Sequence, residues 1–160
     1  MPEKETLERA EKDARQGKSA STQAGEFVRE EIHHIREGKH GARSTKQAIA
    51  IGLSKARRSG VKLKSPQKGT TSARTRNQAT RELRKGRVRR KPSRTRSRAT
   101  SRALKREEHG AASRKSLAAQ ARSSANRRGT AARQGAARKA VNTKGSRGRS
   151  QAARTRASHR

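Results

Sequence analysis

The sequence predicts an all-α protein in which a small N-terminal helical hairpin precedes a long, largely disordered basic tail with only transient helices. Two amphipathic helical patterns lie close together before residue 64, and 11 of the 16 Met, Val, Ile, Leu and Phe residues are found there. The other 97 residues hold five such side chains, too few to offset the entropy of ordering that chain. We therefore divide the chain into residues 1–20, 21–63 and 64–160.

Residues 3–17, EKETLERAEKDARQG, are predicted to form a first helix of mixed charge, followed by a short linker. The segment is rich in helix formers and in Glu residues placed before Lys or Arg, and Gly17 closes it. Its apolar side consists only of Leu7, Ala10 and Ala14. Such a helix is marginal in isolation.

The next segment, STQAGEFVREEIHHIREG, predicts an amphipathic helix. Ser21 or Thr22 is the expected N-cap, and Glu26 lies early, where a carboxylate favours the helix dipole. Gly38 supplies the stop. Apolar residues recur at spacings of three and four, which predicts one buried stripe made of Ala24, Phe27, Val28, Ile32 and Ile35.

Residues 40–60, HGARSTKQAIAIGLSKARRSG, predict the second helix of the hairpin. Ser44 starts a capping box in which the Gln47 side chain reaches back to the Ser44 amide. Ile49, Leu53 and Ala56 follow at i, i+4 and i+7, with Ala48 and Ile51 beside them. A helix-turn-helix motif that turns at Gly52 is the alternative. It would bury an apolar residue where Arg58 stands, so we expect one continuous helix ending at Gly60.

The two helices are expected to pack as a hairpin around a small core. A unit of this size buries proportionally little surface. We therefore expect it to need the first helix, a second copy, another protein or nucleic acid for full stability. The predicted core consists of Phe27, Val28, Ile32, Ile35, Ile49, Ile51, Leu53, Val61 and Leu63.

A degenerate repeat follows in the tail. HGAASRKSLAAQARSSANRRG, residues 109–129, aligns without gaps on residues 40–60, and ten of the 21 positions are identical. Weaker echoes occur at 68–86 and 144–157. Each is a short, basic, Ala-rich segment that begins with a potential helix cap. We expect these segments to become helical when phosphate neutralises their arginines.

Charge indicates the partner. The chain has 45 Lys and Arg against 12 Asp and Glu, and residues 64–160 hold 31 of these bases with only three acids. A segment with so many positive charges repels itself, and a polyanionic partner would neutralise that repulsion. One Phe and no Trp or Tyr disfavour both membrane binding and base stacking, so backbone binding to a nucleic-acid duplex is expected.

The densest basic run is ELRKGRVRRKPSRTRSR, residues 82–98, and Pro92 within it predicts an extended arm that follows the phosphate backbone. Arginine suits this role because it contacts phosphate in a bidentate manner. The predicted nucleic-acid-binding residues are Lys46, Lys55, Arg57, Arg58, Arg84, Lys85, Arg87, Arg89, Arg90, Lys91, Arg94, Arg96, Arg98, Arg127 and Arg128.

Catalytic, metal and cofactor sites are not expected. The chain has no cysteine and no phosphate-binding glycine motif. The neighbouring residues Glu30, Glu31, His33 and His34 point in different directions on a helix, which favours a solvated polar face. His33, Glu37 and His40 offer three possible metal ligands, but without cysteine or HExxH spacing.

No apolar run is long enough to span a membrane, and MPEKETLERAEKD is too polar for a signal peptide. We expect a soluble, cytoplasmic protein.

GEFVREEIHHIREGKHGARSTKQAIAIGLSKARRSGVKL, residues 25–63, resembles a family of small, basic, uncharacterised bacterial proteins with a Lys/Arg/Ala-rich tail. Segments 96–107 and 136–157 are also similar to that tail, although this one is richer in Arg. The resemblance implies a domain of unknown function with a DNA-binding role and supplies no catalytic residues. In composition the tail is similar to histone-like tails.

Together these features predict a non-enzymatic, nucleoid-associated protein that binds and compacts DNA without sequence preference. Two alternatives stay open. The tail can contact structured RNA, as in a ribosome-associated basic protein, or the hairpin can act as an adaptor for a protein partner.

Overall fold

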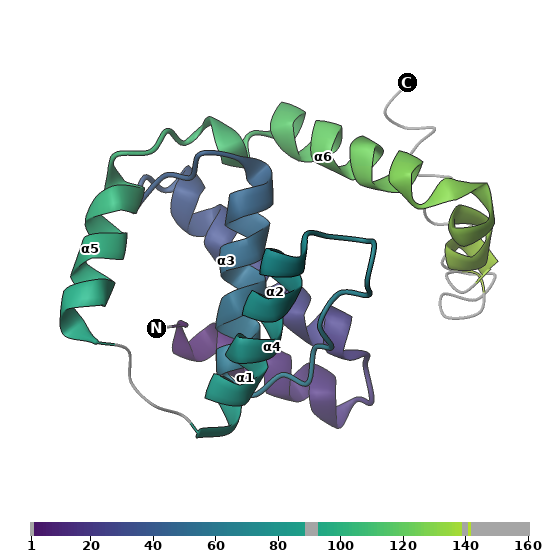
Figure 1. Ribbon diagram of the computed structural model, residues 1–160, viewed down its shortest axis with the longest axis horizontal. Helices are drawn as coiled ribbons and strands as arrows, with labels where there is room; N and C mark the ends of the chain where they lie inside the picture. Colours follow the sequence, from purple (N-terminus) through teal and green to yellow (C-terminus); the bar gives the residue numbers. More distant parts are fainter. Residues whose placement is uncertain (1, 89–92, 139–140, 142–160) are drawn as a thin grey trace. The chain divides into compact units, whose positions relative to one another are not determined.

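The computed structural model describes residues 2–88, 93–138 and 141, and the predicted all-α class is confirmed (Figure 1). An isolated bridge between Lys68 and Thr71 is the one β feature among the described residues, and none of their helices is long and apolar enough to cross a membrane. The described residues divide into two units, one ending at Leu117 and the other beginning at Ala118. The helices in order are α1 (Lys4–Arg15), α2 (Ala20–Arg36), α3 (Thr45–Arg58), α4 (Ala73–Val88), α5 (Arg94–Lys105), the 3₁₀ turn η1 (Gly110–Ala112) and α6 (Arg114–Arg127).

Helices α2 and α3 pack side by side and form the centre of the first unit (Figure 1). The Ser44 hydroxyl caps α3 by accepting a hydrogen bond from the Gln47 amide at 3.2 Å, as predicted. The Gln47 side chain reaches back to the amide of Arg43 rather than that of Ser44. The predicted cap of α2 was two or three residues late, because Ser19 fills that position and accepts from the Thr22 amide. Helix α3 is continuous, so no turn interrupts it at the glycine.

The stripe that α3 buries differs from the predicted one. Ala48, Gly52 and Ala56 are the fully buried residues, whereas Ile49 and Leu53 are only half-buried. The reason is close approach of the two helices: a Cβ added at Gly52 would lie 2.7 Å from the Cα of Val28. Small residues allow this contact, and the larger apolar side chains flank it.

The core extends beyond the hairpin in two directions. One cluster joins Ala10 of α1 to Phe27 and Val61, so the first helix completes the fold rather than standing apart. A second cluster joins Ile35 of α2 to Ala112 of η1. Both sides of the hairpin are therefore covered by chain from outside residues 21–63.

The tail also differs from its prediction where it is described. Helices α4, α5 and α6 occupy much of a region predicted to be largely disordered, and the run predicted as an extended arm is helical up to Val88 and again from Arg94. Helix α4 packs on α3, where the buried Glu82 accepts hydrogen bonds from the Arg58 guanidinium, one of them at 2.8 Å. A Cβ at Gly86 would clash with the Arg57 carbonyl oxygen, which shows how closely the two helices approach.

The degenerate repeat has a structural counterpart. In the alignment of the two copies, α3 and α6 begin at equivalent residues and end at equivalent residues. The capping bond recurs as well, because the Ser113 hydroxyl accepts from the Ser116 amide at 3.1 Å. Gly60 and Gly129 both have positive φ after their helices.

Candidate nucleic-acid interface

Helix α5 carries a stripe of positive charge. At 100° per residue, four of its five cations fall within roughly 80° of one another on the helix surface, over a length of about 16 Å. The fifth, Arg96, lies on the other side. The helix contains no acid, buries no side chain and packs on no other helix of the described chain. The stripe consists of Arg94, Arg98, Arg102 and Lys105, and all four are exposed.

Helix α4 presents a second basic face, opposite its contact with α3. Ala79 and Glu82 are buried on the packed side. The exposed face carries Arg74, Arg81, Arg84 and Lys85.

Most of the predicted nucleic-acid-binding residues are exposed where they are described. Arg87 lies in α4, and Arg89, Arg90 and Lys91 lie outside the described residues. Arg58 is exposed, but its charge is paired with Glu82. The remaining exposed members of the predicted set are Lys46, Arg84, Lys85, Arg94, Arg96, Arg98, Arg127 and Arg128.

Lys55 and Arg57 do not belong to the exposed set. The Lys55 ammonium lies 3.0 Å from Glu30 Oε1 and 2.7 Å from Glu31 Oε2. Burial alone would lower the pKa of Lys55, but the carboxylates of Glu31 and Glu30 raise it above its ordinary value. Arg57 is 7% exposed, and its Nε–H donates to the Leu63 carbonyl. Both cations are engaged within the fold and are not available to phosphate.

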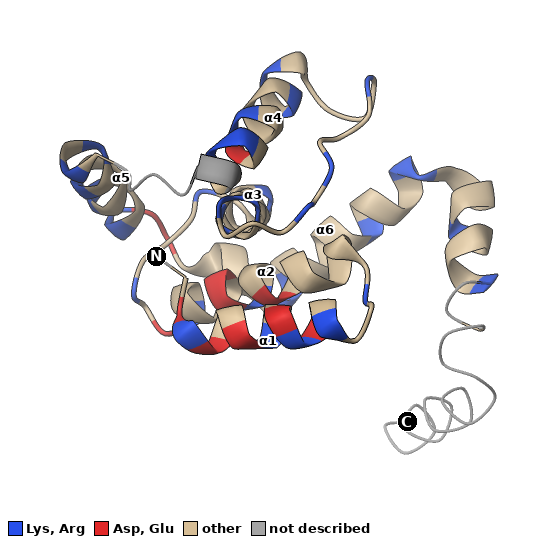
Figure 2. Cartoon of the chain, turned by 90° about the horizontal axis from the view of Figure 1, so that it is seen from below, with Lys and Arg blue, Asp and Glu red and all other residues tan. Residues whose placement is uncertain are grey.

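Most acids of the first unit lie on α1 and α2, where basic side chains also occur, whereas α3 and α5 carry basic residues and no acid. Figure 2 shows acidic and basic residues together on α1, and basic residues along α3, α4 and α5. Sequence reasoning omitted Arg102 and Lys105 from the binding set. Their spacing from Arg94 and Arg98 by whole helical turns was the signal that could have found them.

The predicted solvated face at Glu30 and Glu31 is wrong, because both side chains are buried. Burial alone would raise the pKa of Glu30, but Lys55, Thr6 and the Glu3 amide outweigh it and lower the pKa below its ordinary value. The sequence does not reveal this burial, because neighbouring residues on one helix can both be buried when each has its own partner besides the shared Lys55. Glu30 faces the N-terminus of α1 and Glu31 faces the loop before α3.

The three metal ligands weighed from the sequence do not come together. His33 pairs with Glu37 at 3.0 Å on the surface of α2, whereas His40 Nε2 lies 3.3 Å from Glu31 Oε1. The structure instead groups Glu31, His34 and His40, one potential ligand atom of each lying within 4.8 Å of the others.

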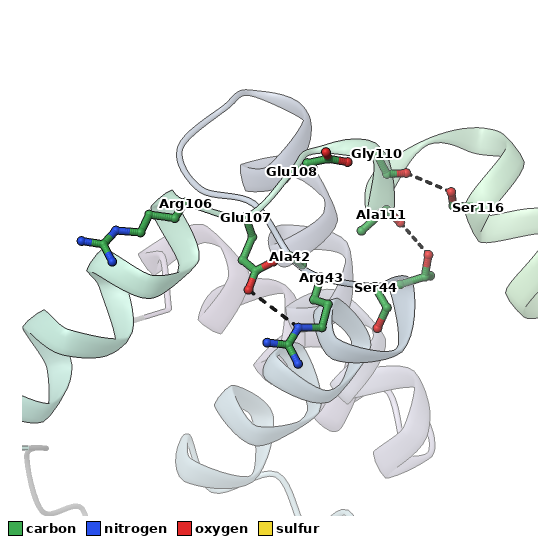
Figure 3. A pocket seen from close by; sticks show the side chains of 10 residues that line it. Ala42, Arg43, Ser44, Arg106, Glu107, Glu108, Gly110, Ala111 and Ser116 are labelled. Atoms are coloured by element: carbon green, nitrogen blue, oxygen red, sulfur yellow. Dashed lines mark hydrogen bonds and ion pairs between the residues drawn. The ribbon is translucent and has the colours of Figure 1, made fainter.

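A cavity of about 680 Å³ lies between the start of α3 and the segment 106–116 (Figure 3). Its hydroxyls are engaged within the fold: Thr45 Oγ1 donates to the Ala111 carbonyl at 2.6 Å and Ser116 Oγ to the Gly110 carbonyl at 2.9 Å. Arg43 Nε lies 3.9 Å from Glu107 Oε1. The lining includes no imidazole or thiol.

Comparison with known proteins gives one match. The model described as "Family of unknown function (DUF6496)" matches residues 15–69, about a third of the chain, which include α2 and α3. No curated protein and no solved structure matches the chain. The match is consistent with the uncharacterised domain that residues 25–63 resemble.

Proposed function

We propose that the chain binds duplex DNA through backbone phosphates, without reading base sequence, as a nucleoid-associated protein of the bacterial cytoplasm. The cationic stripe of α5 is the observation that carries this proposal. Packing does not account for the stripe, because within the described residues α5 has no neighbouring helix and no buried side chain. A polyanion would account for it.

The electrostatics of the stripe favour a phosphate partner. Like charges at i and i+4 destabilise a helix by about 0.2–0.5 kcal/mol per pair, and α5 holds Arg94, Arg98 and Arg102 at this spacing. Neutralisation by phosphate removes that repulsion. Binding to DNA should therefore also raise the helix content of α5.

Sequence-blind binding is supported by what surrounds the stripe. Phe27, the one aromatic residue of the Phe, Tyr and Trp type, is fully buried, so it is not available to stack on an unpaired base. Contacts to the phosphate backbone remain, and these fix position without specifying sequence. Single-strand recognition by stacking is correspondingly disfavoured.

Competition gel shifts test the proposal. The full chain, bound to a labelled duplex, is challenged with unrelated duplexes and with structured RNA at matched salt. We expect unrelated duplexes to compete equally and RNA to compete less well. Clear preference for RNA would replace the proposal with a ribosome-associated or other RNA-binding role. Absence of binding to both would favour an adaptor function for the hairpin.

A further inference from the structure

We propose that Glu31, His34 and His40 form a site for a divalent transition-metal ion, with Zn²⁺ as the expected occupant. Two imidazoles and one carboxylate are a donor set that suits Zn²⁺, with water completing the coordination. The site lies where α2 meets the loop before α3, and its ligands are not part of the basic stripe of α5. It does not depend on the function proposed above.

The distances fit a common ligand sphere. Bonds of about 2.0–2.1 Å in a tetrahedron separate two ligand atoms by about 3.3 Å. Glu31 Oε1 and His40 Nε2 are 3.3 Å apart. The His34 and His40 ring centroids are 6.0 Å apart with their planes at 85°, so the two rings can present nitrogens to one point without stacking.

The second observation is the state of the Glu31 carboxylate. Its side chain is 1% exposed, and Oε2 is ion-paired with the Lys55 ammonium at 2.7 Å. Oε1 faces His40 Nε2 at 3.3 Å and has no hydrogen-bond partner within the described chain. A buried carboxylate oxygen without a partner is costly, and coordination to a cation would satisfy it.

Both histidines are oriented as metal ligands usually are. His34 Nε2 lies 2.8 Å from Glu3 Oε1, and His40 Nδ1 lies 3.1 Å from the Gly41 carbonyl oxygen. A proton donated at each of these contacts leaves the other ring nitrogen with its lone pair. Ligating histidines commonly hold their second nitrogen to a carboxylate or carbonyl in this way.

The local charge also favours a divalent cation. Ion pairs connect four carboxylates around the site to only two ammonium groups, those of Lys39 and Lys55. With neutral imidazoles this network carries two excess negative charges, which one divalent ion would balance. Its carboxylates are those of Glu3, Glu30, Glu31 and Glu37.

A metal ion at this site would hold in place a loop that forms hydrogen bonds with a later segment of the chain. Gly41, next to His40, donates its amide to the Leu104 carbonyl at 2.9 Å, and Ala42 donates to the Glu108 carbonyl at 3.0 Å. A cation bound by α2 and His40 would hold this loop against α2. Metal binding should therefore stabilise the first unit.

Zn²⁺ titration of the full, chelator-stripped chain against a competing chromophoric chelator tests the proposal. We expect one equivalent to bind and His34→Ala and His40→Ala each to raise the Kd at least about tenfold. Glu3→Gln should raise it by about tenfold through His34. His33→Ala is the matched control, because this histidine lies next to His34 but is 67% exposed; its Kd should change less than about twofold.

Co²⁺ in place of Zn²⁺ supplies a readout that loss of folding cannot imitate. Visible absorption of the wild-type Co²⁺ complex should indicate four-coordination and should weaken in Glu3→Gln, whose fold is checked by circular dichroism. Failure of the wild-type chain to bind Zn²⁺ would overturn the proposal. Loss of binding in His33→Ala with retention in His40→Ala would also overturn it.

Discussion

Gly52 of α3 lies directly against the backbone of Val28 in α2, and a Cβ at this glycine would meet the Val28 Cα at 2.7 Å and its nitrogen at 2.9 Å. Backbone atoms cannot yield as a flexible side chain can. Gly52→Ala must therefore push the two central helices apart. We expect a loss of about 1–3 kcal/mol in the free energy of unfolding, larger than the ~1 kcal/mol that alanine gains as a helix former.

Gly25→Ala is the matched control for this prediction. Gly25 lies inside α2, and a Cβ there would meet nothing within 4 Å. Its replacement should stabilise the protein by about 0.5–1 kcal/mol. Urea unfolding followed by circular dichroism measures both. A stabilising Gly52→Ala would show that the helices are not in this close contact.

Lys55 is expected to act in the fold and not in DNA binding. Lys55→Met removes the ammonium group between Glu30 and Glu31 and leaves two buried carboxylates without their counter-ion. We expect a loss of about 3 kcal/mol in the free energy of unfolding, reduced from the fully buried case because Lys55 is partly exposed. Lys46→Met, at an exposed position of the same helix, should change stability by less than ~0.5 kcal/mol. Equal effects of the two substitutions would contradict the buried ion-pair network.

Local sequence signals predicted the helices of the hairpin well. The Ser44 cap and the terminal Gly60 follow from interactions within a few residues, and both are found. Periodicity did not predict which face of α3 is buried. It favours large apolar side chains such as Ile49, whereas the partner helix selects Gly52 for its lack of a side chain.

Contacts between residues far apart along the chain could not be predicted from the sequence. Composition made residues after 64 appear unable to fold, yet α4 packs on α3, and the buried Glu82 is ion-paired there with Arg58. In the same way, Glu31 and His40 are nine residues apart in sequence and meet only because the loop turns back along α2. Pairings of this kind depend on tertiary packing, which periodicity does not report.

Glu82 should make docking of α4 depend on pH. Burial alone would raise its pKa, but Arg58, with Lys85 and Gln78, lowers it below the ordinary value for glutamate. A carboxyl whose pKa is lower in the folded state contributes stability that is complete above its unfolded-state pKa. That stability is lost as pH falls through the lower, folded-state value.

We therefore expect Glu82→Gln to cost about 1 kcal/mol near neutral pH, and the difference from wild type to shrink on acidification below the ordinary glutamate range. Thermal unfolding across this pH range measures it. Glu108→Gln, at an exposed carboxylate, is the control and should give a constant, small difference. A Glu82→Gln difference that does not change with pH would contradict the ion pair with Arg58.

The α5 stripe predicts a specific salt dependence of DNA affinity. If Arg94, Arg98 and Arg102 each neutralise one phosphate, replacing all three with Gln should make the slope of log K against log salt less negative by about 2.7. Filter binding or fluorescence anisotropy over a salt series measures the slope.

A second triple variant separates local contact from total charge. Lys4→Gln, Lys12→Gln and Arg15→Gln remove three exposed cations from α1, among its acidic residues. The total charge removed is identical, but these side chains lie on α1, whose cations are interspersed with acidic residues. Their slope should stay about that of wild type. An equal change in both triple variants would mean that α5 makes no preferred contact.

The equivalent caps of α3 and α6 should differ in what they stabilise. Ser44→Ala removes the hydroxyl that caps α3, a helix of the core, and should lower the free energy of unfolding by about 1 kcal/mol. Ser113→Ala removes the same hydrogen bond from α6, which buries none of its residues. It should therefore speed hydrogen exchange in the first turns of α6 with a smaller effect on global unfolding. Ser123→Ala, at an exposed position inside α6, should slow that exchange, since alanine is the better helix former. If Ser113→Ala also slowed it, the capping role inferred from the repeat would be wrong.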